Sequence, residues 1–206
     1  MRRWIISLAL AGLAATSAGA DDRPVVVELF TSQGCSSCPP ADELMHGLAK
    51  DANVIALALH VDYWDYIGWK DSFASPAFTE RQRNYARVQS ERMVYTPQMM
   101  VNGVAHVVGN RANDVQQLIN THRNSDRQVQ TRATVADGTA TISVETTAIQ
   151  GPFIIHLVSY APRSEVDIRR GENAGRTISY ANVVTDWRSV AEWSGTSNRS
   201  YSVSLT

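Results

Sequence analysis

The sequence predicts an α/β domain over residues 21–126, followed by a β-sandwich-like all-β domain over residues 127–206. In the first region, apolar runs rich in β-branched residues alternate with stretches of helical periodicity, as in α/β folds. In the second region, the apolar runs resemble strands and no convincing helix is present. A chain of 206 residues is long enough for one or two domains with cores of their own.

The composition is that of a globular protein with a nearly neutral surface. Hydrophobic residues make up 44% and charged residues 19% of the chain, and 19 Lys and Arg face 20 Asp and Glu, for a net charge of -1. This balance gives no electrostatic basis for binding nucleic acid, so we expect no nucleic-acid partner. Two cysteines cannot form a multi-disulfide framework, so the fold must depend on its core.

The first twenty residues have the pattern of a secretory signal peptide. A short basic start, Met1–Arg3, precedes the apolar run Trp4–Ala15, and Ala18-Gly19-Ala20 fits a small-residue cleavage site. The alternative is an uncleaved anchor, but the apolar run is too short to span a bilayer. We therefore predict cleavage after Ala20, a periplasmic or secreted location, and contact with the membrane only during export. An oxidising compartment allows a disulfide to persist.

Three elements open the mature chain. The run Arg23–Phe30 is apolar and β-branched, which indicates a buried strand. After a turn and the cysteines, Ala41–Lys50 has helical periodicity, and the prolines before it are tolerated at a helix start. A second apolar run, Asn53–Val61, predicts the next strand.

A second helix is expected from Pro76 to about Arg92, because Ser75 is a good cap and proline is favoured at the first helical position. Asn102-Gly103 is a strong hairpin signal. The remaining elements of this region are strands at 98–101 and 104–108 and a helix at 113–124.

The second region contains strand patterns only. Asp137-Gly138 marks a hairpin between the first two strands. The expected strands are 128–135, 139–147, 153–160, 178–187 and 200–205.

Two segments have two interpretations each. The irregular segment Asp62–Ser75 is rich in aromatic residues, which could line a groove beside an active site or, as we favour, pack inside the protein. The polar loop around Arg169–Arg176 could bind a ligand, although a solvated hairpin is the simpler interpretation.

The motif Cys35-Ser36-Ser37-Cys38 stands directly before the first helix, and the order of elements around it is that of a thioredoxin-like fold. A helix N-terminus supplies partial positive charge and free N–H groups, which stabilise a thiolate. We therefore predict a redox-active pair in which Cys35 is the nucleophile and Cys38 resolves the mixed disulfide. Asp42 and Glu43 place negative charge near the thiols and should moderate the fall in the pKa of Cys35.

Three other interpretations of the cysteine pair remain open. A purely structural disulfide closing so short a loop stabilises by only roughly 2 kcal/mol. Cu(I) accepts soft sites of low coordination number, and Met99, Met100, His60 and His106 could contribute ligands. The third alternative is a redox-silent binding module. We expect no organic cofactor, because no glycine-rich phosphate loop is present, and no structural metal site, because a second Cys-x-x-Cys motif is missing.

Thr96 and Pro97 are the candidate substrate-binding residues. A thioredoxin-like fold carries a cis-proline opposite the cysteines, and the residue before it pairs with the substrate backbone. Pro97 stands directly before a strand and the Asn102-Gly103 hairpin, which is the corresponding position. The alternative is an ordinary trans proline at the start of a strand.

Glu28 is the third candidate catalytic residue. A charged side chain within an apolar strand is costly unless it is paired or neutral. In thioredoxin-like proteins an acid near this position accepts a proton from the second cysteine. The alternative is a Glu28 side chain that points to solvent at the strand end.

Several segments together resemble one family, the exported thioredoxin-like proteins grouped as domain of unknown function 1223. The resemblance covers essentially the whole mature chain. It is carried by FTSQGCSSCPPAD at Phe30–Asp42, HVDYWDYIGWKDSFASPAFTERQRNYA at His60–Ala86, YTPQMMVNG at Tyr95–Gly103 and GENAGRTISYANVV at Gly171–Val184.

This resemblance implies a thioredoxin-like domain followed by a β-rich domain, and it implies no established substrate. Gly34 stands where thioredoxins usually carry Trp. The function that we predict is an exported thiol–disulfide oxidoreductase acting on protein or small-molecule thiols and disulfides.

Overall fold

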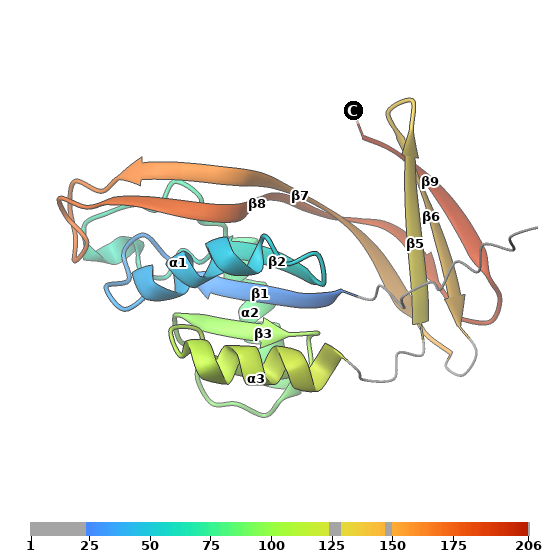
Figure 1. The fold of residues 1–206 in the computed structure, drawn as a ribbon, viewed down its shortest axis with the longest axis horizontal. Helices are drawn as coiled ribbons and strands as arrows, with labels where there is room; N and C mark the ends of the chain where they lie inside the picture. Colours follow the sequence, from blue (N-terminus) through green and yellow to red (C-terminus); the bar gives the residue numbers. More distant parts are fainter. Residues whose placement is uncertain (1–23, 124–128, 147–149, 206) are drawn as a thin grey trace, which may run out of the picture.

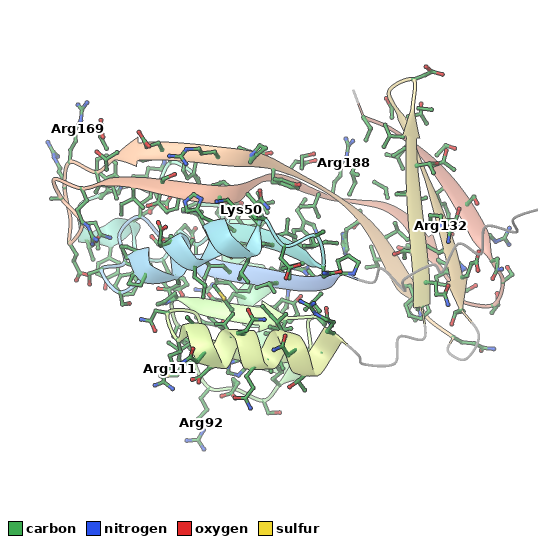
Figure 2. The ribbon with its side chains drawn as sticks, viewed as in Figure 1. Lys50, Arg92, Arg111, Arg132, Arg169 and Arg188 are labelled. Atoms are coloured by element: carbon green, nitrogen blue, oxygen red, sulfur yellow. A yellow bond between two sulfur atoms is a disulfide. The ribbon has the colours of Figure 1, made fainter. Side chains whose placement is uncertain are left out.

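The computed structural model describes residues 24–123, 129–146 and 150–205, and these form a mixed α/β structure (Figure 1). The signal peptide predicted at residues 1–20 lies outside the described residues. Within the described ranges, no helix is long and apolar enough to cross a membrane. Basic side chains are spread over the surface, as Lys50, Arg111, Arg132 and Arg169 illustrate (Figure 2).

The elements of the first region follow the predicted order. α2 ends at Val88, four residues earlier than expected, and Ser90 just beyond it adopts a left-handed backbone conformation with φ of 59°. The elements are β1 (Val25–Thr31), α1 (Pro39–Leu48), β2 (Val54–His60), a short 3-10 helix η1 (Asp65–Ile67), α2 (Pro76–Val88), β3 (Gln98–Val101), β4 (Ala105–Val108) and α3 (Ala112–Arg123).

The second region consists of strands, as predicted, but these are divided between two sheets. The strands are β5 (Val129–Ala136), β6 (Thr139–Thr146), β7 (Phe153–Asp167), β8 (Thr177–Trp193) and β9 (Arg199–Ser204). β7 and β8 complete a six-stranded sheet of order β4-β3-β1-β2-β8-β7, whereas β5-β6-β9 form a separate three-stranded sheet. The expected boundary at residue 127 therefore does not coincide with a division between sheets.

The reason for this difference is the length of the β7–β8 hairpin. The two strands have 15 and 17 residues, whereas the sequence patterns suggested strands ending near Tyr160 and Trp187. Pro162 does not stop β7, because the ladder passes from the pair Ala161–Val183 to the pair Arg163–Ala181. One half of the hairpin can therefore join the central sheet while the other half reaches the three-stranded sheet (Figure 1).

The hairpin joins the central sheet through a short contact between β8 and β2. The two strands run parallel and pair at Ala58 and Val183. Beside this pair, Asn182 adopts a left-handed conformation with φ of 48°, and its Nδ2 donates to the carbonyl oxygen of Ala56 at 2.9 Å. The Asn182 side chain thus supplies a hydrogen bond between β8 and β2 that backbone groups would supply in a longer ladder.

Helices cover both faces of the central sheet. α1 and α3 pack on one face through Met45 and Ile119, and α2 packs on the other face through Phe78. Alternation along β1 assigns Val27 and Leu29 to the first core and Phe30 to the second. An odd-numbered or even-numbered position in β1 therefore decides which of the two cores a side chain faces.

The three-stranded sheet packs against the distal half of the hairpin. Ile142 and Val144 of β6 form a core with Trp193 of β8, and Phe153 and Tyr201 pack around it. The turn between β5 and β6 lies at Asp137 and Gly138, both with positive φ, as the Asp-Gly signal predicted.

Candidate active site

Cys35 and Cys38 form a disulfide at the start of α1. Their Cα atoms lie 5.4 Å apart, and Cys38 is the N-cap residue of the helix. Both cysteines are buried, with exposed fractions of 1% and 0%. The pair therefore lies where a helix N-terminus favours negative charge, but below the molecular surface.

The segment Thr96–Pro97 lies beside the disulfide, and its peptide bond is cis, as expected. Ser37 Oγ, which is 3.4 Å from Cys35 Sγ, donates to the carbonyl oxygen of Thr96 at 3.4 Å. The indole N–H of Trp64 donates to Thr96 Oγ1 at 2.8 Å. The structure thus brings together four of the five predicted site residues: both cysteines, Thr96 and Pro97.

The aromatic segment explains why residue 34 is a glycine. A Cβ atom at Gly34 would lie 3.2 Å from side-chain atoms of Trp64 and Ile67, so the backbone passes directly under these side chains. Trp64 stacks with Tyr66, which is 80% exposed. Farther along the segment, Phe73 packs in a core with Tyr180 of β8. Apart from Tyr66, the aromatic residues therefore pack inside the protein, as we favoured, and Trp64 in addition contacts the backbone before Cys35 and the side chain of Thr96.

The tip of the β7–β8 hairpin contacts the cysteine loop directly. Asn173 is buried, and its Nδ2 donates to the carbonyl oxygens of Gln33 and Cys35, both at 2.9 Å. Glu172 accepts from the backbone N–H of Ser36 at 3.3 Å. The loop that we expected to be a solvated hairpin is instead docked on the backbone of the cysteine loop. Gly171 and Gly175, both with positive φ, shape this turn and were the only local signal of it.

A group of buried polar side chains lies beneath the disulfide. Asp42 is on α1 one turn after Cys38, and its Oδ1 accepts from Thr31 Oγ1 at 2.8 Å. Burial raises the pKa of Asp42 to about 7, although the hydrogen bond from Thr31 and the charge of His60 oppose the rise. His60 Nδ1 lies 2.8 Å from Asp71 Oδ2. Sequence reasoning treated Asp42 only as a nearby charge and His60 only as a possible copper ligand.

Glu28 is buried, but it lies on the opposite face of β1 from Cys38. Arg81 of α2 binds it with Nε and Nη2 at 2.6 and 2.8 Å, and Tyr85 Oη donates to it at 2.9 Å. Both interpretations of Glu28 need correction, because the carboxylate is neither in solvent nor beside the cysteines. Alternation along the strand is the physical reason: α1 and the disulfide lie on the Val27 and Leu29 face, and Glu28 points away from it.

Of the four expected copper ligands, Met100 and His106 lie away from the disulfide. Met99 packs in the core under α1 and α3, whereas Met100 packs on the α2 face. His106 lies at the far edge of the sheet, where its Nδ1 is 3.0 Å from Tyr95 Oη. Among the described residues, no three His, Cys, Asp or Glu side chains are placed to hold a metal ion together.

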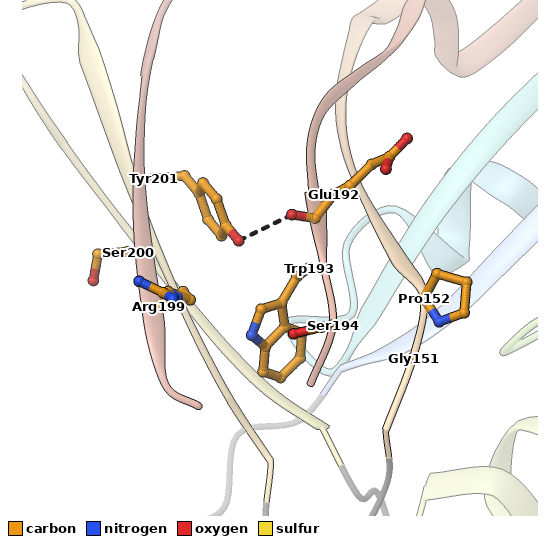
Figure 3. Close-up of a pocket in the computed structure, with 8 residues that line it drawn as sticks. All are labelled: Gly151, Pro152, Glu192, Trp193, Ser194, Arg199, Ser200 and Tyr201. Atoms are coloured by element: carbon orange, nitrogen blue, oxygen red, sulfur yellow. Dashed lines mark hydrogen bonds between the residues drawn. The ribbon is translucent and has the colours of Figure 1, made fainter. Parts of the chain in front are cut away.

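Two hollows in the protein surface lie away from the disulfide. A cavity of about 640 Å³ between β8 and β9 is lined by Trp193, Arg199 and Tyr201, and Tyr201 Oη donates to the carbonyl oxygen of Glu192 beside it (Figure 3). A second, mostly apolar hollow of about 900 Å³ lies on the α2 face of the sheet beside Arg81 and Trp187. Neither hollow includes a cysteine.

Residues 26–206 match the family described as protein of unknown function, DUF1223. The chain belongs to the DUF1223 family. The resemblance noted in its motifs is thus confirmed. The fold is similar to the crystal structure of a protein from Agrobacterium tumefaciens, with a TM-score of 0.76 and 33% sequence identity over 88% of this chain and 78% of the other. A comparison with curated proteins finds no match.

The placement of Glu28 predicts a purely structural role. Glu28→Gln removes the charge that pairs with the partly buried Arg81, so we expect the free energy of unfolding to fall by about 2 kcal/mol. Urea denaturation measures this change. Glu80→Gln is the matched control, because its ion pair with Arg87 is solvent-exposed and should contribute nothing measurable. A Glu28→Gln variant of normal stability with altered dithiol kinetics would contradict this assignment.

The docked hairpin tip predicts restricted access to the disulfide. Asn173→Ala leaves two loop carbonyls without their donor, which weakens docking by about 1.4 kcal/mol and makes opening of the tip roughly tenfold more frequent. Reduction by a protein dithiol should become about tenfold faster, while reduction by a small phosphine should change less. Asn110→Ala is the control, since its amide reaches only Ser37 O, at 3.5 Å. Equal acceleration in both variants would refute the role of the tip.

Proposed function

We propose that this protein is an exported thiol–disulfide oxidoreductase with a thioredoxin-like active site. The observation that carries the proposal is the Cys35–Cys38 disulfide at a helix N-terminus, with the buried carboxyl group of Asp42 one helical turn after Cys38. A disulfide that served stability alone would need no titratable group in its buried surroundings. Export rests on the signal-peptide pattern of residues 1–20.

In the reduced protein, the Cys35 thiolate attacks one sulfur of a substrate disulfide. A mixed disulfide forms, the substrate S–S bond breaks, and the first substrate thiolate leaves and takes up a proton. The Cys38 thiol then gives its proton to Asp42 and attacks the sulfur of Cys35. The second substrate thiolate leaves, so the protein loses two electrons and the substrate gains them. The same steps in reverse oxidise a substrate dithiol.

The assignment of roles follows from position. Cys35 precedes the helix in the loop beside Thr96, whereas Cys38 is the N-cap of the helix that carries Asp42 in its first turn. Thr96 and Pro97 form the side of the site against which a substrate strand would lie. The substrates are protein or small-molecule thiols and disulfides, and the chemistry needs no cofactor, because the two sulfurs carry both electrons.

Asp42 replaces Glu28 as the proton acceptor for Cys38. Its pKa of about 7 lets it accept and return a proton near neutral pH, which is the requirement for a general acid and base. The hydrogen bond from Thr31 fixes Oδ1, and Oδ2 is buried with no partner among the described residues. Oδ2 is therefore the oxygen on which the proton is held.

The cysteine chemistry predicts covalent trapping. A Cys38→Ala variant cannot resolve a mixed disulfide, so Cys35 should retain a thiol-containing substrate that mass spectrometry detects after purification under non-reducing conditions. Cys35→Ala is the control and should carry no adduct. In the unaltered protein, alkylation with and without reductant should show a pair that opens and closes reversibly. A pair that stays closed at every redox poise tested rules out the proposed function.

Asp42 also predicts how stability depends on pH in the oxidised protein. Because the folded pKa is raised, the folded state holds a proton that the unfolded state has lost, so stability falls as pH rises from about 4 to about 7 and then levels. The difference from the ordinary value of 3.8 corresponds to roughly 4 kcal/mol as an upper limit. Asp42→Asn should therefore be more stable than the unaltered protein at pH 8 but not at pH 4.

Urea denaturation at pH 4 and pH 8 measures this effect. Glu43→Gln is the control, because Glu43 is exposed on the same helix and should leave the pH dependence unchanged. An Asp42→Asn variant whose stability changes with pH as steeply as that of the unaltered protein would show that folding does not raise the pKa of Asp42.

A further inference from the structure

Three buried polar atoms near the disulfide have no hydrogen-bond partner among the described residues. They are Oδ2 of Asp42 on α1, Nε2 of His60 on β2 and Oη of Tyr180 on β8. Their residues are no more than 2% exposed. Because buried polar groups in proteins are almost always paired, three such atoms from neighbouring side chains require an explanation.

The fold brings these side chains to one place. Thr31 and His60 are partners in the parallel register of β1 and β2, so their side chains lie on the same face, and Thr31 donates to Asp42. The ring of His60 lies 4.8 Å from the ring of Tyr180, with an interplanar angle of 73°. Asp42, one helical turn after Cys38, acts electrostatically on both His60 and Tyr180, so the three side chains share one buried region although their unpaired atoms are not hydrogen-bonded to one another.

Asp71 determines which nitrogen of His60 faces this position. Asp71 Oδ2 accepts from the backbone N–H of Gln33 at 2.8 Å and lies 2.8 Å from His60 Nδ1, while its Oδ1 accepts from the N–H of Phe73. Burial opposes ionisation of Asp71, but the charge of His60 and these hydrogen bonds lower its pKa overall. An ionised Asp71 only accepts hydrogen bonds, so Nδ1 of His60 carries a hydrogen and Nε2 is the nitrogen that can gain or lose a proton.

We propose that His60, oriented by Asp71, holds the proton that Cys38 gives up when the disulfide forms. This inference rests on the proposed function and adds a positioning residue to it. On oxidation near or above pH 7, where Asp42 does not keep the proton, it passes from Cys38 Sγ to Asp42 and then, through a water molecule held among the three unpaired atoms, from Asp42 Oδ2 to His60 Nε2. This transfer leaves an imidazolium beside the carboxylate of Asp71. On reduction, the proton returns along the same groups to Cys38. No electron passes through His60.

The remaining groups around His60 support this assignment. Burial keeps the pKa of Tyr180 far above its usual value, so its hydroxyl retains its hydrogen and can donate to whichever neighbour is unprotonated. Phe73 packs edge-on against the imidazole at 5.2 Å and helps to exclude water. Arg176 faces Tyr180 from the hairpin tip. The charged and titratable groups facing His60 are thus Asp42 from α1, Asp71 from the loop after η1, and Tyr180 with Arg176 from the hairpin.

The test measures the equilibrium between the protein dithiol and glutathione from pH 5 to pH 9. A plot of the equilibrium constant against pH changes slope at a characteristic pH, and we expect His60→Gln to shift that pH by at least one unit. We also expect this variant to slow the resolution of the mixed disulfide by Cys38 about tenfold. Asp71→Asn should shift the profile in the same way, because it removes the charge that stabilises the imidazolium. His46→Gln is the matched control: His46 lies one turn beyond Asp42 on α1, and its Nε2 is 3.1 Å from the carbonyl oxygen of Ser179.

A second measurement does not depend on the stability of any variant. Nitrogen NMR of histidine-labelled protein at pH 7 should show His60 more protonated in the oxidised than in the reduced state. Identical His60 spectra in the two states, or pH profiles of His60→Gln and His46→Gln that coincide, would overturn this inference. A pair that never cycles with glutathione would instead refute the proposed function. The two failures are therefore distinguishable.

Discussion

The short junction between β2 and β8 is the constraint on which the candidate site depends. One parallel pair, Ala58 with Val183, and the amide of Asn182 join the long hairpin to the central sheet. Because the junction sets the position of β8, it places Tyr180 against His60 and carries Asn173 to the carbonyls of the cysteine loop. Without it, the eight elements from β1 to α3 would leave the disulfide uncovered on one side.

The buried carboxyl groups of Glu28 and Asp42 lie on opposite faces of β1 and have different surroundings. Glu28 has Arg81 and Tyr85 as partners, so it is a fixed part of the α2 core. Asp42 has one hydroxyl donor and, among the described residues, no ion pair, so burial favours its neutral form. A buried carboxyl group thus forms a fixed ion pair on one face of β1, whereas on the other face a buried carboxyl group can exchange a proton.

Local patterns were enough to predict the elements around the cysteines, because caps, turn residues and apolar periodicity act over a few positions. Ser75, Asn102-Gly103 and the position of Pro97 were interpreted correctly on this basis. The side on which Glu28 lies was missed because an acid within an apolar run does not reveal which face has a cation. The docking of Asn173 and the pairing of His60 with Asp71 join residues 138 and 11 positions apart, and one sequence carries no signal for such contacts.

The length of β8 also determines where the protein can be labelled or immobilised. A strand of 17 residues extends about 55 Å, and its two ends lie beside the disulfide and beside the three-stranded sheet (Figure 1). The three-stranded sheet lies at the end of the molecule away from the cysteines (Figure 1). A tag, fluorophore or solid support fixed there would stand clear of any partner bound at the cysteines. The molecule can therefore be immobilised for single-molecule or surface measurements with its reactive end facing solution.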